Sequence, residues 1–232
     1  MMKQFLVTGV SGGLGKYLFD NLPDCSGLHR TNFDEVSSES YDTIIHCAYN
    51  KENIITDYKQ YIEDNIFLLQ KVKKIKHKKF VYISSIDVYN EQKNNYSLFK
   101  MFAESLLNSD DLILRLSCLL GKTSKPNHVS KIMSNVEYIS LEENSTFNYT
   151  LYSELLSFFS ENLHINKIGI CDFVANDFVY LKDVISFAKS NTKTGQYCYN
   201  SKYQFVNPIY LDHPEYNKSS LEKLNLFISN SE

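Results

Sequence analysis

The sequence predicts an α/β protein built on a doubly wound parallel sheet, with a smaller portion at its C-terminal end. Three observations indicate this class. In the first half of the chain, short apolar runs alternate with amphipathic stretches, which is the pattern of β-α-β units. A glycine-rich turn joins the first apolar run to the first amphipathic stretch. After residue 121 the alternation weakens and the elements become shorter.

Taken in order, the apolar runs predict strands and the runs of helical spacing predict helices. Strands are expected at residues 5–8, 25–30, 43–48, 80–84 and 112–117, and helices at 14–22, 57–75 and 96–108. The basic run 71–79 suits the C-terminus of the second helix, and we interpret it as a solvated helix end rather than a binding patch.

The second half of the chain is expected to contain shorter elements. A loop is expected at 122–127, strands at 147–150 and 167–174, and helices at 152–162, 181–190 and 219–228. We therefore place a boundary near residue 121, with a dinucleotide-binding core over 1–121 and a small second portion over 122–232. Some elements of the second portion are expected to return to the core.

Composition excludes several classes of function. The chain has 232 residues and a net charge of −3, which gives no reason to expect binding to nucleic acid or to an anionic membrane. Its five cysteines are dispersed without a Cys-x-x-Cys pair, and its six histidines are equally scattered, so no metal site is expected. Unpaired cysteines and the lack of a targeting or membrane-spanning segment predict a cytoplasmic protein.

The glycine-rich turn over residues 7–15 predicts a dinucleotide site of Rossmann type. Glycines permit a tight turn and let the backbone approach a pyrophosphate, which the amides and dipole of the following helix then hold. The residues expected to line this site are Gly9, Ser11, Gly12, Gly13, Leu14 and Gly15. A glycine-rich turn also serves as a plain strand–helix joint, so its position after the first strand carries the prediction.

The end of the second strand indicates the cofactor. An acidic residue there would bond the adenosine ribose, whereas a cation would accommodate a 2′-phosphate. The chain has His29 and Arg30 at this point and no carboxylate before Asp34. NADP(H) is therefore preferred over NAD(H), with Arg30 as a surface charge being the simpler alternative.

A proton-relay pattern follows the strand over 80–84. Ser85 ends that strand, and Tyr96 and Lys100 stand one helical turn apart at the start of the next helix. A nearby ammonium would lower the pKa of the tyrosine, and Ser85 could hold a substrate oxygen while Tyr96 moves its proton. A second Tyr-x-x-x-Lys match, Tyr89 and Lys93, does not open an amphipathic helix, which favours Tyr96.

Thr-Gly-x-x-Gly-x-x-Gly, Ser-Ser-x-x-Val-Tyr and Tyr-x-x-x-Lys together resemble the extended short-chain dehydrogenases/reductases, in particular the NAD-dependent epimerase/dehydratase family of nucleotide-sugar enzymes. The resemblance spans residues 3–190. It implies a Rossmann-like doubly wound parallel sheet with a small C-terminal substrate-binding portion, and a possible homodimer. It also implies that Ser85 orients the substrate oxygen, that Tyr96 is the acid or base, that Lys100 bonds the nicotinamide ribose, and that Ala48 lies along the cofactor.

Four departures narrow this expectation. Only eleven positions separate Ser85 from Tyr96, and Cys118 replaces an asparagine that contacts the nucleotide-sugar. The Asp-Glu pair of the dehydratases is replaced by Ile86 and Asp87, and the C-terminal portion is short. The sequence therefore predicts an NADP(H)-dependent reductase of a keto group on a nucleotide-activated sugar. The alternatives are a nucleotide-sugar epimerase, which needs only transient oxidation, and a non-catalytic NAD(P)-binding sensor or scaffold.

Overall fold

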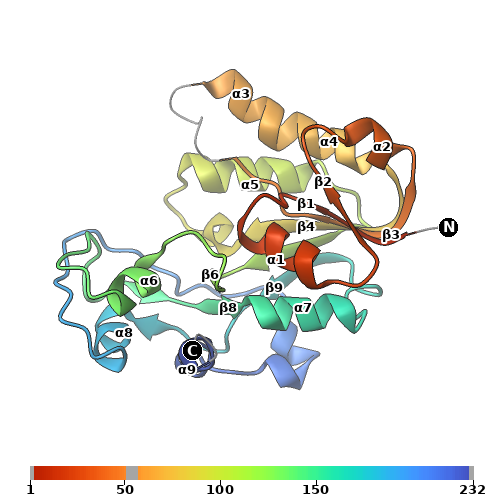
Figure 1. The fold of residues 1–232 in the computed structure, drawn as a ribbon. Coiled ribbons are helices and arrows are strands. Elements are labelled where there is room, and N and C mark those ends of the chain that lie inside the picture. Colours follow the sequence, from red (N-terminus) through yellow and green to blue (C-terminus); the bar gives the residue numbers. More distant parts are fainter. Residues whose placement is uncertain (1–2, 51–56, 230–232) are drawn as a thin grey trace.

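The computed structural model describes residues 3–50 and 57–229, and its centre is a six-stranded sheet (Figure 1). The strands lie in the order β2-β1-β3-β4-β5-β9, and every neighbouring pair is parallel. Their bounds are Lys3–Thr8 for β1, Cys25–Leu28 for β2, Ser40–His46 for β3, Lys76–Ser85 for β4, Leu112–Leu116 for β5 and Gly169–Phe173 for β9. The strand order reverses beside β1, so the crevice outside the carboxyl ends of β1 and β3 is the expected ligand site.

Helices cover both faces of this sheet (Figure 1). On one face α1 (Gly13–Asn21) and α7 (Tyr152–Ser160) share a core with β1, β5 and β9. On the other lie α2 (Phe33–Ser37), α3 (Tyr58–Ile62), a π-helical turn η1 (Glu63–Phe67), α4 (Leu68–Lys73) and α5 (Asn95–Ser105). These layers confirm the doubly wound α/β class. They also place α7 and β9, which come from residues 122–232, in the core.

The basic run 71–79 is not a helix end throughout, and that interpretation is wrong for its second half. Helix α4 ends at Lys73, and β4 begins at Lys76. The side chains of this stretch of β4 alternate between solvent and the interior, and Lys79 is only 8 % exposed. Its ammonium donates to the carbonyl oxygen of Asp110 at 2.9 Å, so the charge is satisfied by backbone rather than by water.

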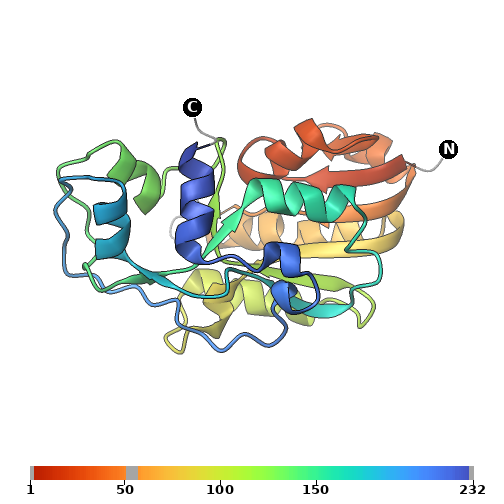
Figure 2. The same ribbon diagram turned by 90° about the horizontal axis from the view of Figure 1, so that it is seen from below.

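The rest of the second portion forms a small lobe beside the sheet (Figure 2). It contains two short sheets, β10 with β7 and β6 with β8. Its elements are α6 (His128–Met133), β7 (Thr146–Phe147), β8 (Tyr149–Leu151), β10 (Val179–Tyr180), α8 (Leu181–Phe187) and α9 (Ser220–Ser229). The strand β6 (Cys118–Leu120) comes before residue 121 but pairs with β8 in this lobe. The turns η3 (Ile209–Leu211) and η4 (Pro214–Tyr216) instead pack on the core that α1 and α7 share. In the part of the chain that the structure describes, no helix could span a membrane.

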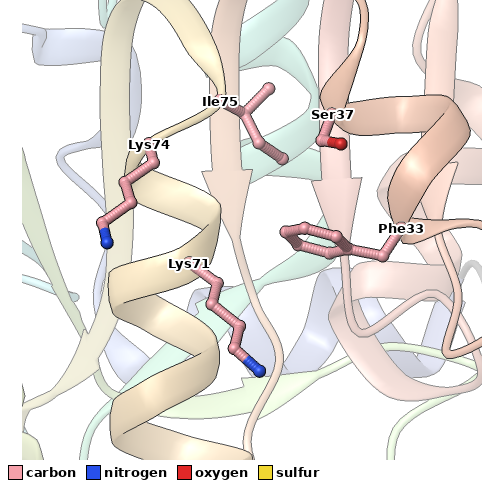
Figure 3. Close-up of a pocket in the computed structure, with 5 residues that line it drawn as sticks. All are labelled: Phe33, Ser37, Lys71, Lys74 and Ile75. Carbon is pink, nitrogen blue, oxygen red and sulfur yellow. The ribbon is translucent and has the colours of Figure 1, made fainter.

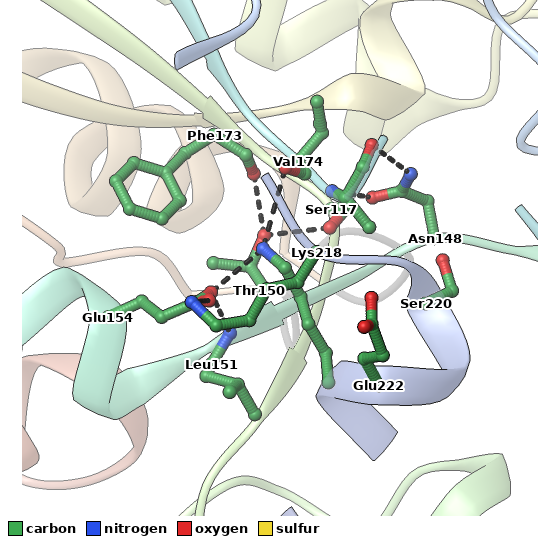
Figure 4. Close-up of polar contacts among 12 residues, drawn as sticks. Ser117, Asn148, Thr150, Leu151, Glu154, Phe173, Val174, Lys218, Ser220 and Glu222 are labelled. Atoms are coloured by element: carbon green, nitrogen blue, oxygen red, sulfur yellow. Dashed lines mark hydrogen bonds and ion pairs between the residues drawn. The ribbon is translucent and has the colours of Figure 1, made fainter. Parts of the chain in front are cut away.

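A buried polar cluster fastens the last helix to this framework (Figure 4). Lys223 of α9 is completely buried, and its ammonium lies 2.8 Å from a carboxylate oxygen of Glu154 on α7. Lys218 lies 3.5 Å from the other oxygen of the same carboxylate. Nearby, the Thr150 hydroxyl donates to the carbonyl of Phe173 at 2.6 Å, which ties β8 to the end of β9. The lobe is thus joined to the sheet by paired rather than unsatisfied polar groups.

An extended segment near the C-terminus runs along the free edge of β9. The Asp172 amide donates to the carbonyl of Asn207 at 2.8 Å, and the Asn207 side chain donates to the carbonyl of Ile170 at 3.1 Å. The Asp172 carboxylate, which is fully buried, accepts from the amides of Val206 and Asn207 at 2.9 and 3.1 Å. We call residues 203–208 the edge segment.

Candidate active site

The structure brings Ser85, Tyr96 and Lys100 together at the carboxyl end of β4. Ser85 is the last residue of that strand, and Tyr96 and Lys100 lie in the first two turns of α5. The Lys100 ammonium donates to the carbonyl of Ile83 at 2.7 Å, which anchors α5 to the strand. A capping box between Asn94 and Ser97 fixes where α5 begins and so sets the height of Tyr96.

The second Tyr-x-x-x-Lys match has no such arrangement. Tyr89 lies in the 3-10 turn η2 (Ile86–Tyr89), and its hydroxyl donates to both carboxylate oxygens of Asp172 at 2.9 Å. Lys93 lies outside any helix and bonds the carbonyl of Asn90. Helix context therefore separates the two matches as the sequence predicts.

Aromatic rings surround the Lys100 ammonium. It lies 4.6 Å from the ring centre of Tyr49, 4.8 Å from that of Tyr82 and 5.9 Å from that of Tyr96. Lys100 is 4 % exposed, and burial lowers its pKa to about 7, against the smaller opposing effects of Cys47 and Glu104. Desolvation thus outweighs the favourable contact of a cation with ring faces.

Tyr96 has a raised pKa, which is the opposite of the direction expected from the sequence. Burial of the phenol is the largest cause, and the negative charge of Asp87 adds to it, while an interaction with the Ser85 hydroxyl works against it. Lys100 does not offset these effects because its ammonium is directed to the carbonyl of Ile83. In this structure the phenol is therefore held in its protonated form.

The glycine-rich turn lies across the crevice between β1 and β3. Gly9 has φ +73°, and a side chain there would place Cβ 2.9 Å from the Ala48 amide nitrogen. At Gly15 a Cβ would lie 2.5 Å from the carbonyl oxygen of Gly9, so the first turn of α1 can pack only if this residue is glycine. Gly12, which caps α1, faces open space with no atom within 4 Å. Close packing inside the turn and open space outside it fit the approach of a pyrophosphate to the α1 amides.

The remaining residues expected at this site have different positions. Gly13 is in the left-handed region with φ +58°, Ser11 is exposed, and the Leu14 side chain belongs to the core, which leaves its amide at the start of α1. The Ala48 amide donates to the Thr8 hydroxyl at 2.9 Å, which joins the ends of β3 and β1. Ala48 therefore lies beside the turn.

Arg30 lies just past the end of β2, with its side chain 90 % exposed. Its guanidinium is 3.9 Å from the Asp64 carboxylate, which is a weak contact at this exposure. Arg30 therefore lies at the carboxyl end of the edge strand β2, next to β1.

Several residues of the site could not be read from local motifs. Asn65 lies in the π-helical turn η1, accepts from the Asn50 amide at 2.8 Å and donates to the carbonyls of Asn50 and Tyr61 at 2.8 and 3.0 Å. Asn65 thereby holds the backbone at Asn50, next to Tyr49, whose ring lies against the Lys100 ammonium. The Tyr49 hydroxyl also bonds that of Tyr61.

Asp172 of β9 is linked to the site through Tyr89. The Arg115 guanidinium lies 4.8 Å from the Tyr89 ring centre and pairs with both oxygens of Glu104 at 3.0 and 2.6 Å. Tyr89 in turn bonds Asp172. This line of polar groups, of which only Asp172 is fully buried, joins η2 to α5, β5 and β9, and it depends on partners distant in sequence.

The described residues line at least two cavities. A cavity of about 160 Å³ lies between α2 and α4 (Figure 3), where Lys71 and Lys74 flank Phe33, Ser37 and Ile75. It is close to the start of β4, away from the carboxyl ends where ligands of such sheets bind. A larger cavity of about 460 Å³ is bounded by the edge segment and by the residues before β10. Among the described residues, no cluster of histidine, cysteine or carboxylate side chains could hold a metal ion.

A parallel sheet whose strand order reverses beside β1, with helices on both faces and a glycine-rich turn at the reversal, defines a Rossmann-like α/β fold. Solved structures agree over nearly the whole chain. A dTDP-4-dehydrorhamnose reductase from Bacillus anthracis, in complex with NADP, aligns with a TM-score of 0.74 and 19% identity and covers 99% of this chain and 100% of its own. A UDP-glucuronic acid 4-epimerase from Bacillus cereus, with NAD, aligns at 0.72 with 16% identity and covers 99% and 100%.

A third structure, RMD from Pseudomonas aeruginosa complexed with NADPH, aligns with a TM-score of 0.69 and 19% identity over 94% of each chain. No model of a known protein family matches the sequence, and no curated protein matches it. At these identities the likeness establishes the fold. The chain has the Rossmann-like fold of these three structures, as the sequence predicts.

Proposed function

We propose that this chain is an NADP(H)-dependent oxidoreductase that reduces a keto group of a nucleotide-activated sugar. The observation that carries the proposal is the meeting of Ser85, Tyr96 and Lys100 at the carboxyl end of β4, beside the crevice that the glycine-rich turn borders. Similar folds that bind NADP and NADPH include a reductase of a dTDP-4-dehydro sugar.

The residues present fit a nicotinamide dinucleotide. Gly9, Gly12 and Gly15 leave the α1 amides open to a pyrophosphate, with Ser11, Gly13, Leu14 and Ala48 beside them and Lys100 at the ribose. When bound, the cofactor supplies the hydride. Ser85 then holds the carbonyl oxygen, and Tyr96 donates a proton to the oxygen as negative charge develops on it. Burial raises the pKa of Tyr96, so the phenol carries its proton before the reaction.

A direct test is Tyr96→Phe, measured as NADPH oxidation at 340 nm with dTDP-4-keto-6-deoxyhexoses and UDP-4-ketohexoses. Loss of a general acid lowers turnover by about 10²- to 10⁴-fold. Tyr138→Phe, which alters a tyrosine 59 % exposed in the lobe, is the matched control and should keep full turnover. Full turnover by Tyr96→Phe would contradict the proposed role.

We propose NADP(H) rather than NAD(H) because the Arg30 guanidinium, and no carboxylate, follows directly on the end of β2. Arg30→Ser should weaken NADPH binding by about tenfold and leave NADH binding nearly unchanged, because only the 2′-phosphate loses a partner. Quenching of intrinsic fluorescence measures both affinities. Equal losses for the two cofactors would remove Arg30 from the site.

The alternative reactions separate in the same assays. An epimerase would convert a nucleotide-sugar without net consumption of cofactor, which NMR of the sugar anomeric protons detects. A sensor or scaffold would bind NADPH and exchange no hydride with any carbonyl compound. The presence of both Tyr96 and Lys100 supports an active enzyme over a sensor or scaffold. An epimerase would use the same two residues, so the NMR assay decides between reduction and epimerisation.

We also propose a homodimer formed through α3 and α5, in a cytoplasmic protein whose cysteines are all unpaired. Large apolar side chains are exposed on these two helices: Tyr58, Leu98, Met101 and Phe102 are 41 to 57 % exposed. Leu98→Glu and Phe102→Glu should leave the fold intact and shift the mass measured by light scattering from dimer to monomer. A monomeric parent protein would contradict this part of the proposal.

A further inference from the structure

Tyr199 extends from the lobe to the turn that follows Ser85. Its hydroxyl donates to a carboxyl oxygen of Asp87 at 2.6 Å. Asp87 lies in η2, two residues after Ser85. The lobe thus contacts the candidate active site through this phenol.

The lobe holds Tyr199 by both its backbone and its ring. The Tyr199 amide donates to the Ser145 hydroxyl at 3.1 Å, and the Tyr199 carbonyl accepts from the Thr146 amide at 2.8 Å. The Tyr199 ring centre lies 5.1 Å from that of Phe147, at an interplanar angle of 18°. Phe147 stacks in turn on His128, with 3.7 Å between ring centres. Little freedom is therefore left in the direction in which the phenol donates.

On the side of the site, η2 holds the Ser85 hydroxyl. Ser85 is the N-cap of this turn, and its hydroxyl oxygen accepts from the Asp87 amide at 3.2 Å. This bond uses a lone pair of the oxygen and leaves the O–H to be donated to a substrate. At the other end of η2, the Tyr89 hydroxyl donates to Asp172 at 2.9 Å. The turn that directs Ser85 is therefore held at its second residue by the lobe and at its last residue by β9.

We propose that Tyr199 is a positioning residue of this site: by holding Asp87 it fixes η2, and η2 directs the Ser85 hydroxyl toward the substrate oxygen. This inference depends on the proposed reductase function. A donor that is fixed in advance stabilises the charge that develops on the oxygen better than one that must first reorient. Tyr199 acts through Ser85 alone, so its loss should affect turnover and not the binding of NADPH.

The positioning can be measured without cofactor or substrate, as hydrogen exchange of the Asp87 amide followed by NMR. Tyr199→Phe removes only the hydroxyl and should speed this exchange about tenfold, because η2 opens more often once its bond to the lobe is lost. Tyr197→Phe is the matched control, since it lies two residues away with its side chain 62 % exposed. Equal exchange in Tyr199→Phe and Tyr197→Phe overturns the proposal.

Turnover supplies the second arm, with NADPH and the dTDP-4-keto-6-deoxyhexose or UDP-4-ketohexose that the parent protein reduces. Tyr199→Phe should lower kcat about tenfold and leave the affinity for NADPH unchanged. Ser85→Ala should lower kcat about a hundredfold, and the addition of Tyr199→Phe should then change kcat by less than about twofold, because the group that Tyr199 positions is gone. Losses that multiply in the double variant overturn the proposal, since a merely structural role of Tyr199 would not depend on Ser85.

Variants of Asp87 test the hydrogen bond from its other end. Asp87→Asn keeps an oxygen that accepts from Tyr199 and should retain most of the turnover, whereas Asp87→Leu removes the acceptor and should match Tyr199→Phe. Equal losses in the two Asp87 variants overturn the role of the bond. If the parent reduces none of these sugars, the reductase proposal fails, and exchange of the Asp87 amide still decides whether Tyr199 holds η2.

Discussion

Three buried histidines make the fold sensitive to acid. His46, His128 and His164 are 1, 8 and 0 % exposed. Burial lowers the pKa of His46 and His128 from 6.5 to about 3 and that of His164 to about 4. Each ring also hydrogen-bonds one hydroxyl: that of Thr8, Tyr149 and Thr43 respectively.

The direction of this pH dependence follows from the number of protons that the folded and unfolded chains bind. Between pH 6.5 and the lowered values, the unfolded chain binds a proton at each of these positions and the folded chain does not, so the stability present above pH 6.5 is lost as the pH falls. At 1.36 kcal/mol per pH unit, each histidine costs about 2 kcal/mol at pH 5. The sum of about 6 kcal/mol is comparable with the whole stability of an ordinary domain. The pKa of Asp87 is raised in the folded protein, so this carboxyl group acts in the opposite direction and offsets the uptake of at most one proton.

Urea unfolding followed by circular dichroism between pH 7 and 5 measures this dependence. His128→Gln should reduce the slope of unfolding free energy against pH by about 1.4 kcal/mol per unit, because one titrating group is removed. It will also lower stability at pH 7, since the imidazole stacks on Phe147 at 3.7 Å between ring centres. His29→Gln, an exposed site, is the control. The reasoning is refuted if His128→Gln and His29→Gln have the same slope as the parent.

Two further perturbations test the turn and the lobe. Gly12→Ala should keep the parent stability and weaken NADPH binding, because its Cβ would enter open space outside the turn. Intact NADPH binding in Gly12→Ala would indicate a plain strand–helix joint. Gly15→Ala should lower the free energy of unfolding by about 3 kcal/mol or more, because its Cβ would meet a backbone oxygen at 2.5 Å. Lys223→Met should lower the free energy of unfolding by about 3 kcal/mol, because it leaves the buried Glu154 carboxylate poorly paired. Lys193→Met is the control, since Lys193 and its partner Glu137 are 73 and 87 % exposed, and it should change that free energy by no more than about 0.5 kcal/mol. Urea titrations compare the two lysine variants, and equal losses would exclude the buried pair as the cause.

The sheet and its helices were predictable because their signals are local. The core strands and the covering helices α1, α3, α4, α5 and α7 occur where apolar periodicity places them, and the helix expected over 57–75 is interrupted by the π-helical turn η1. The five-residue helix α2 is not predicted, because it is too short for a periodic signal. Helix α6 was missed because six residues are too short for a periodic signal, although Asn127 and Ser130 form a capping box. The start of β4 was misread because four basic residues in succession mask its alternation.

The candidate site divides in the same way. Ser85, Tyr96 and Lys100 lie within one strand–turn–helix unit, so their spacing alone predicts that they meet. The hydrogen bond of Tyr199 to Asp87 joins residues 112 positions apart, which no local pattern specifies. The raised pKa of Tyr96 was also beyond the sequence, because desolvation depends on how tightly α5 packs against the strand ends.

The edge segment has a consequence for how this chain can be shortened. An uncovered strand at the border of a sheet presents a row of unpaired amides and carbonyls that recruits other chains. Here Asn207 and Pro208 occupy that border along β9. A truncation that removes residues 203–229 would therefore do more than delete part of the lobe. It would expose the unpaired amides and carbonyls of β9, and other copies of the chain would aggregate by pairing with that strand.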